Sequence, residues 1–203
     1  MRKTLLALTL LAFASTAQAT TIVFSDNFDA DALALNTVPT GWTVTDGTVD
    51  VIGVVNFFDF IPGSGRYIDL DGSTNDAGVL TKSLLLTAGL TYTATFDLAG
   101  NHRNSSPETV TSILGVGLGN VSNTFSLAET AGWTSFSLTF TPFVTGNYIL
   151  SFGNSGGDNI GMLLDNVTVS VPEGGNTTYA MFAVMVGLFG FEGRRRLVGA
   201  KRG

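Results

Sequence analysis

The stretch Thr91-Tyr-Thr-Ala-Thr-Phe-Asp-Leu98 decides the fold, because apolar and polar side chains alternate along its whole length. Successive side chains of a β-strand point to opposite faces, so the Tyr, Ala, Phe and Leu of this stretch line one face. The three threonines and Asp97 line the other. A helix would scatter the same apolar residues around its axis. The stretch therefore predicts a strand with one buried face and one polar face.

The same alternation recurs between Thr134 and Thr141, where Phe136, Leu138 and Phe140 share a face. Ten segments are predicted to be strands: Trp42 to Asp46, Val49 to Val55, Arg66 to Leu70, Val79 to Leu86, Thr91 to Leu98, Val110 to Leu118, Val121 to Leu127, Trp133 to Thr141, Tyr148 to Phe152 and Leu163 to Val171. Runs rich in glycine and asparagine separate them, and no helical pattern stands out between residues 20 and 171. This pattern predicts an all-β domain over residues 20–170, an antiparallel β-sandwich or jelly roll.

Residues 1–19 have the composition of a secretory signal peptide. Arg2 and Lys3 precede an apolar run from Leu5 to Ala14, and Ala17-Gln18-Ala19 offers small residues for cleavage. We expect cleavage after Ala19 and export of the chain. The alternative is an uncleaved anchor, but the apolar run is too short to span a bilayer comfortably.

The exported part is acidic and has no cysteine. Three basic and fourteen acidic residues between positions 20 and 171 leave a net charge of −11. Nucleic acid is therefore not expected as a partner, because phosphate binding needs clustered Lys and Arg. The absence of cysteine from the whole chain excludes disulfides and thiol chemistry. The acids serve solubility, or some of them bind cations.

The C-terminus has three parts in order: Val171-Pro172-Glu173-Gly174-Gly175, an apolar run from Tyr179 to Phe191, and the cluster Arg194, Arg195 and Arg196. Proline and glycine are not expected to continue a central strand, so the motif should be extended and open to proteases. Residues 177–191 predict a membrane-anchor helix of about 22 Å, shorter than a hydrocarbon core of about 30 Å, with the arginines on the cytoplasmic side. A basic tail, 197–203, follows. The alternative is a buried helix of the globular domain.

This arrangement resembles the PEP-CTERM class of bacterial sorting signals, in its VPDSG/VPEGG-type variant, over residues 171–196. The resemblance implies an exosortase-type membrane protease or transpeptidase as partner. It also implies delivery to the cell envelope, cell surface or extracellular matrix, after transient anchoring in the inner membrane. Two features depart from the family: Glu-Gly stands where Asp-Ser is commoner, and seven residues follow the arginines.

Four short motifs of the body follow one another in a familiar order: Asp26-Asn27-Phe28-Asp29, Gly41-Trp42-Thr43-Val44, Tyr67-Ile68-Asp69-Leu70-Asp71-Gly72 and Leu164-Asp165-Asn166-Val167-Thr168-Val169. This order resembles galactose-binding-like jelly rolls, which include DUF642-type domains and several carbohydrate-binding modules. The resemblance covers Ile22 to Ser170. It implies binding of a sugar or polysaccharide and a structural calcium between the first and last strands.

Asp29 and Asp165 are the predicted ligands of that calcium. Asp165 shares its parity with Val167 and Val169, so we expect its carboxylate to face the core, where it must be paired or bound to metal. Alternatively, Asp165 accepts backbone N–H groups at a strand end, and Asp29 caps a turn.

Catalytic residues are not predicted. His102, the only histidine, lies in a polar loop, and no nucleophile elbow is present. A carboxylate pair for glycoside hydrolysis stays open, although Glu108 and Glu129 fall in apparent turns.

Sugar binding needs an aromatic platform, and candidates are Trp42, Trp133, Tyr67 and the Phe57-Phe58 pair; Tyr92 fits the core pattern. These residues do not identify a ligand site. We expect a non-enzymatic exported protein that binds carbohydrate. The alternatives are a purely structural matrix component and a polysaccharide-degrading enzyme.

Overall fold

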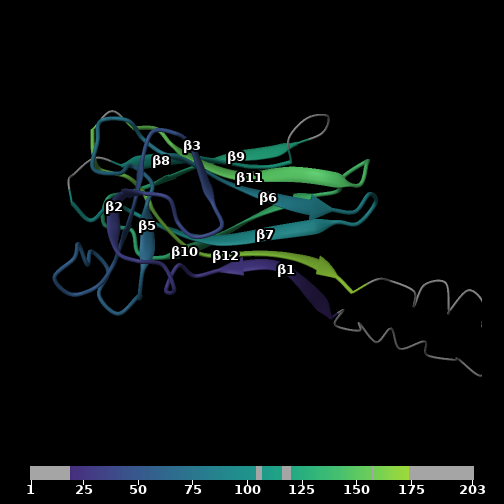
Figure 1. Ribbon diagram of the computed structural model, residues 1–203, viewed down its shortest axis with the longest axis horizontal. Helices are drawn as coiled ribbons and strands as arrows, with labels where there is room; N and C mark the ends of the chain where they lie inside the picture. The colour runs from purple at the N-terminus through teal and green to yellow at the C-terminus, as the bar shows by residue number, and fades with distance from the viewer. Residues whose placement is uncertain (1–18, 104–106, 116–119, 157, 174–203) are drawn as a thin grey trace, which may run out of the picture. The chain divides into compact units, whose positions relative to one another are not determined.

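The computed structural model describes residues 19–103, 107–115, 120–156 and 158–173, and these ranges contain strands and no helix (Figure 1). The strands are β1 (Thr20–Asp26), β2 (Ala34–Thr37), β3 (Thr43–Asp46), β4 (Val49–Ile52), β5 (Tyr67–Asp69), β6 (Val79–Leu86), β7 (Tyr92–Ala99), β8 (Glu108–Leu114), β9 (Val121–Leu127), β10 (Thr134–Phe140), β11 (Gly146–Asn154) and β12 (Leu163–Pro172). No helix in these ranges is long and apolar enough to cross a membrane. The predicted signal peptide, anchor helix and arginine cluster lie outside them.

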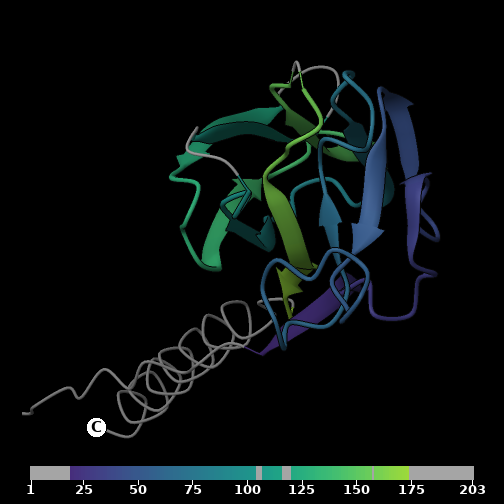
Figure 2. The ribbon, with the colours of Figure 1, turned by 90° about the vertical axis from the view of Figure 1, so that its left-hand side faces the viewer.

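The strands form two sheets. The larger sheet has the order β10-β7-β12-β5-β4-β2, with β1 paired to β12, and the smaller has the order β3-β6-β11-β8-β9. All pairs of named strands are antiparallel. They include the pair of β1 and β12, the first and the last strand in the sequence (Figure 2). This arrangement confirms the predicted antiparallel β-sandwich.

The alternating stretch from Thr91 to Leu98 forms most of β7, which lies between β10 and β12 in the larger sheet. It pairs with β10 in unbroken register, so Phe96 lies opposite Phe136 and Ala94 lies opposite Leu138. Direct cross-strand neighbours share a face, and this face is buried against the smaller sheet. The register thus converts the sequence pattern into one apolar layer.

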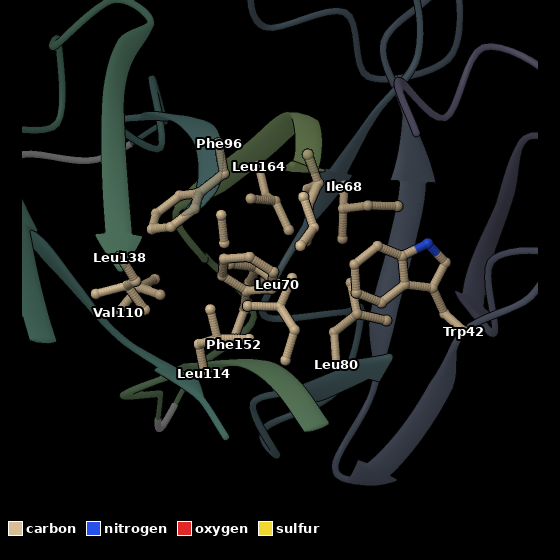
Figure 3. Packing of buried hydrophobic residues seen from close by; sticks show 14 of the residues in the cluster. Trp42, Ile68, Leu70, Leu80, Phe96, Val110, Leu114, Leu138, Phe152 and Leu164 are labelled. Carbon is tan, nitrogen blue, oxygen red and sulfur yellow. The ribbon is translucent and has the colours of Figure 1, made fainter. Parts of the chain in front are cut away.

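The core lies between the sheets (Figure 3). Phe96 of the larger sheet meets Phe152 of the smaller sheet edge to face, with ring centroids 4.9 Å apart. Trp42 closes one side of this layer, 6.3 Å from Phe152. Such aromatic pairs add specific geometry to the burial of apolar area. Thr20–Pro172 therefore forms a compact unit with its own core.

Three local predictions were wrong. The strands β1 and β2 were not predicted, because Ile22, Val23 and their neighbours lack alternation and are largely exposed. Pro172 of the predicted sorting motif continues the strand that was predicted to end at Val171, since it pairs with Thr20 at the end of β12. Pro172 is tolerated there because it is the last residue of its strand.

A second apolar cluster lies on the outer face of the larger sheet. Ile52, Tyr67, Ala99 and Leu163 are buried there beneath the loop of residues 53–66. The hydroxyl of Tyr67 accepts hydrogen bonds from the backbone N–H groups of Phe60 and Ile61, at 2.6 and 3.1 Å. This loop and the strands beneath it build the candidate site.

Candidate functional site

A cleft with a volume of about 110 Å³ opens on the outer face of the larger sheet. Its walls come from β4, β5, the loop of residues 53–66 and three further loops, which follow β5, β7 and β11. The lining residues are Asp50, Ile52, Phe58, Phe60, Asp69, Ser73, Arg103 and Asn159. The cleft therefore combines apolar rings, two carboxylates and a guanidinium group.

The register of β4 and β5 explains why both carboxylates point into the cleft. Asp50 lies directly opposite Asp69 in the ladder. Ile52 and Tyr67, two residues away along each strand, belong to the outer cluster. Because side chains alternate with period two, Asp50 and Asp69 face the same outer side. The intervening Val51 and Ile68 face the core between the sheets.

The buried Asp69 and the partly exposed Arg103 form an ion pair at the base of the cleft. Only 1% of the Asp69 side chain is exposed, and its Oδ2 contacts Nη2 of Arg103. Its Oδ1 accepts hydrogen bonds from the N–H groups of Asp71 and Gly161, both at 3.1 Å. Burial raises the pKa of Asp69 well above its ordinary value, and the charge of Arg103 counteracts this shift. The ion pair is thus held in place by backbone from two loops.

Arg103 is fixed on three sides. Its Nη1 donates to the carbonyl of Asn159 at 2.9 Å, and the guanidinium carbon lies 4.9 Å from the centre of the Phe60 ring. That distance is within the range of a cation–π interaction. Its Nε is buried and finds no hydrogen-bond acceptor among the described residues. Arg103 is therefore oriented in advance.

Asp50 is also oriented. Its Oδ1 accepts from the N–H groups of Asn36 and Ser73, at 2.7 and 3.2 Å, and its Oδ2 accepts from the Ser73 hydroxyl at 2.7 Å. A carboxylate oxygen has about two acceptor positions, so Oδ2 retains capacity for a ligand hydroxyl. Asp50 and Ser73 form a rigid polar wall.

Phe58 is the exposed aromatic residue of the cleft, with 51% of its surface accessible. Its ring centroid lies 5.5 Å from that of Phe57 and 6.2 Å from that of Phe60. Phe58 has φ = 49°, which is rare for a bulky residue and marks a constrained turn. The Phe57-Phe58 pair is thus divided: Phe57 packs against the outer cluster, and Phe58 faces solvent at the cleft.

The prediction that Asp165 faces the core was wrong. Asp165 pairs with Asp97, whose neighbours Phe96 and Leu98 face the core, so both carboxylates lie on the outer face. The register shifts after Asp165, where Asn166 has φ = 51°. This bulge inserts one residue into β12, so the residues after it point to the opposite faces from those expected by simple alternation. Val167 therefore faces the core.

The structure brings Asp29 within electrostatic range of Asp165. Burial raises the pKa of Asp165 to about 7, and the charges of Asp29, Asp97 and Asp26 add to the shift. The carboxylate of Asp29 accepts hydrogen bonds from Arg66 N–H and from Nδ2 of Asn27, both at 2.8 Å. Among the described residues, no group of three Asp, Glu, His or Cys side chains is placed to hold a metal ion. A calcium here would need backbone or water oxygens in addition, and it stays a prediction.

The other aromatic candidates and His102 are packed or hydrogen-bonded within the domain. Trp42 and Tyr92 are buried in the core, as predicted for Tyr92. Trp133 packs on Tyr67 and donates from Nε1 to Ser64 at 2.8 Å. A ring nitrogen of His102 lies 3.1 Å from the carbonyl of Ala131, in a turn with φ = 54°. None of these four residues lines the cleft.

Sequence reasoning missed Asp50, Asp69, Arg103 and Phe58 as one site. A usable signal was present, because Asp69 interrupts the apolar run Tyr67 to Leu70 and is buried there. A buried charge requires a partner, but the partner Arg103 is 34 residues away in sequence. The pairing depends on which loops meet, and no local pattern records that.

Solved structures with the same architecture include several carbohydrate-binding modules. The CBM22-1 xylan-binding domain of Paenibacillus barcinonensis Xyn10C is 14% identical, with a TM-score of 0.55, over 78% of this chain and 99% of that domain. TmCBM61, solved with β-1,4-galactotriose, is 14% identical with a TM-score of 0.50, over 71% of this chain and 93% of the module. The K3 cleaved adhesin domain of Lys-gingipain from Porphyromonas gingivalis is 14% identical with a TM-score of 0.52, over 75% of this chain and 99% of the domain. No protein-family model and no curated protein sequence matches the chain. At these identities the similarities show the fold: a two-sheet jelly-roll β-sandwich of the kind found in carbohydrate-binding modules.

Proposed function

We propose that this domain is a non-enzymatic carbohydrate-binding module whose ligand occupies the cleft around Phe58 and Arg103. One observation carries the proposal: an exposed aromatic ring stands beside a pre-oriented Asp69–Arg103 pair. A sugar ring has an apolar C–H face and an edge of hydroxyl groups. The Phe58 ring suits the face, and the carboxylates and guanidinium suit the hydroxyls.

The size and charge of the cleft restrict the ligand. Its volume of about 110 Å³ is below the several hundred Å³ typical of pockets that enclose drug-sized ligands. We therefore expect it to hold one terminal or branch sugar of a polysaccharide. Asp50 and Asp69 outnumber Arg103, so a neutral sugar fits better than an acidic one. The xylan-binding domain and the galactotriose complex, which share the fold, support this class of ligand.

The test is calorimetry or a glycan array with neutral oligosaccharides and purified protein. Phe58→Ala should weaken binding roughly tenfold, which corresponds to about 1.4 kcal/mol and is a usual size for one aromatic contact. Phe143→Ala is the matched control, because Phe143 is even more exposed but lies far from the cleft along the strands. Binding that Phe58→Ala leaves unchanged would contradict the site. No binding to any glycan would favour the structural alternative, and reducing-sugar release would favour the enzyme.

We also infer that the chain is exported and sorted by an exosortase-type system. This inference is supported by the bounds of the compact unit Thr20–Pro172. The unit begins at the first residue after the expected signal cleavage and ends inside the motif 171–175. Mass spectrometry of the protein from its native host should find an end near residues 171–175 and no peptide from Tyr179 onward. Replacing Arg194, Arg195 and Arg196 with Ser should misroute the chain. Recovery of peptides that end at Gly203 would contradict processing.

A further inference from the structure

Two connections between the sheets, residues 87–91 between β6 and β7 and residues 141–145 between β10 and β11, present apolar side chains to solvent at one end of the sandwich. The N–H of Gly89 donates to the carbonyl of Pro142 at 2.9 Å, and the N–H of Ala88 donates to the Thr145 hydroxyl at 3.0 Å. The turns therefore form one surface, which we call the apolar tip. Its exposed apolar residues are Leu85, Leu90, Phe143 and Val144, and Phe143 is 82% exposed.

The apolar tip is far from the cleft along the strands. In β12, Leu163 at the first end lies opposite Asp69 of the cleft, and Ser170 near the other end lies opposite Thr93, next to the tip. Figure 1 shows the same separation, with β5 at the opposite end from the turn that connects β6 to β7. The domain thus has a cleft end and a tip end.

The tip end carries little charge, although residues 20–171 have a net charge of −11. No Asp, Glu, Lys or Arg occurs in residues 20–25, 83–96, 136–150 or 168–172, which lie in or next to this end, and the exposed Glu173 is the first charged residue after them. Asp69, Asp97 and Asp165 lie toward the cleft end. A large exposed apolar surface without charge marks an interaction site.

The chain also leaves the domain at the tip end. Pro172 is the last residue of β12 and pairs with Thr20. Six residues, 173–178, separate Pro172 from Tyr179, the start of the apolar run, which makes seven steps along the chain. An extended chain covers at most about 3.5 Å per residue, so Pro172, at the tip end, stays within about 25 Å of the start of that run.

We propose that the apolar tip rests on the lipid bilayer while the C-terminal run is inserted in it, an inference that depends on the proposed membrane anchoring. Phenylalanine and aliphatic side chains partition into the interface, and a tether raises their effective concentration there. The two turns of the apolar tip carry no charge, so anionic headgroups repel the tip less than they repel the acidic cleft end. In this position the cleft faces away from the membrane and toward external glycans. Val171 and Pro172 lie at the membrane surface, within reach of a membrane-embedded protease.

The test uses the full chain, which has no cysteine, so that one introduced cysteine is labelled uniquely. Phe143→Cys carries an environment-sensitive fluorophore, and Val55→Cys, exposed in the loop beside the cleft, is the matched control. The protein is reconstituted in vesicles of phosphatidylethanolamine and phosphatidylglycerol that contain a lipid-borne spin-label quencher. We expect at least threefold stronger quenching at position 143 than at position 55. Equal, weak quenching at both positions would overturn the proposal.

Flotation of the same vesicles separates this inference from the proposal on which it depends. If the chain does not float, the membrane anchor itself is wrong. If it floats but position 143 stays in water, only the docking of the tip is wrong. Protection of position 143 in lipid-free protein, together with a dimer mass, would identify a second copy as the partner and also overturn the proposal. With the label at Leu90→Cys, adding Phe143→Ser should reduce quenching at least twofold, and adding Phe58→Ser should not.

Discussion

At the scale of residues, Asp165 makes the stability of the domain depend on pH. Its pKa in the fold is about 7, above the ordinary value of 3.8, because burial disfavours the charged form. Below about pH 4 both folded and unfolded chains hold the proton. Between about pH 4 and 7 the folded chain holds it and the unfolded chain does not, so this contribution to stability falls as pH rises.

Asp165→Asn should therefore stabilise the domain at pH 7.5, by on the order of 2 kcal/mol, because it removes the cost of ionising a buried carboxyl. The amide oxygen can still accept from Asn166 N–H, which Asp165 Oδ1 now does at 2.7 Å. Urea melts of both proteins at pH 7.5 and pH 4 measure the effect, and the gain should shrink at pH 4. The exposed Asp46→Asn serves as control. A gain that is independent of pH would contradict the assignment.

Calcium gives the second prediction for the same side chain. If Asp29 and Asp165 contribute to a calcium site, then adding Ca²⁺ at pH 7.5 should raise the melting temperature and EDTA should reverse the rise. Asp165→Asn should remove the response. A wild-type melting temperature that is the same with Ca²⁺ and with EDTA would contradict the calcium prediction and leave the pH prediction intact.

At the scale of elements, the loop of residues 53–66 depends on one hydroxyl. The buried Tyr67 receives two backbone hydrogen bonds from this loop, and burial raises the pKa of its phenol. Tyr67→Phe leaves the N–H groups of Phe60 and Ile61 without that acceptor. Such a loss costs about 1 to 3 kcal/mol.

We expect Tyr67→Phe to loosen the loop and to weaken glycan binding several-fold, because Phe58 and Phe60 lose their support. Hydrogen exchange should accelerate at residues 57–61 and stay unchanged in β8 and β9, which do not contact this loop. Tyr148→Phe is the control, since its hydroxyl donates to Val144 at the opposite end. Unchanged exchange at residues 57–61 would show that packing, and not the hydroxyl, holds the loop.

At the scale of the whole molecule, the domain should fold without its ends. Residues 20–172 contain both sheets and the core, so this fragment should be soluble, monomeric and β-rich by circular dichroism. A fragment of residues 26–166 lacks β1 and its partner segment of β12, and it should be less stable. Aggregation of 20–172 that restoring Tyr179 to Phe191 cures would show that the tail belongs to the fold.

The sequence by itself determined the class of fold. Alternation in β7 and β10 is a local property of the chain, and burying one face of each strand leaves two packed sheets as the solution. It also determined that Tyr92 is buried, and it assigned Phe57 and Phe58 to a loop. The predicted signal peptide and sorting signal depend on linear motifs, which fall mostly outside the described residues.

Only the tertiary structure decided the site. Asp69 and Arg103 meet because β5 and the loop after β7 come together on one face of the sheet. The residues that flank each of them in the sequence do not indicate this contact. The direction of Asp165 was likewise decided by a bulge, in which one extra residue reverses every side chain that follows. Period-two patterns record which face a strand buries, because that depends on neighbours two residues away. Loop contacts and register shifts depend on residues far apart in the chain, and these appear only when the sheets have formed.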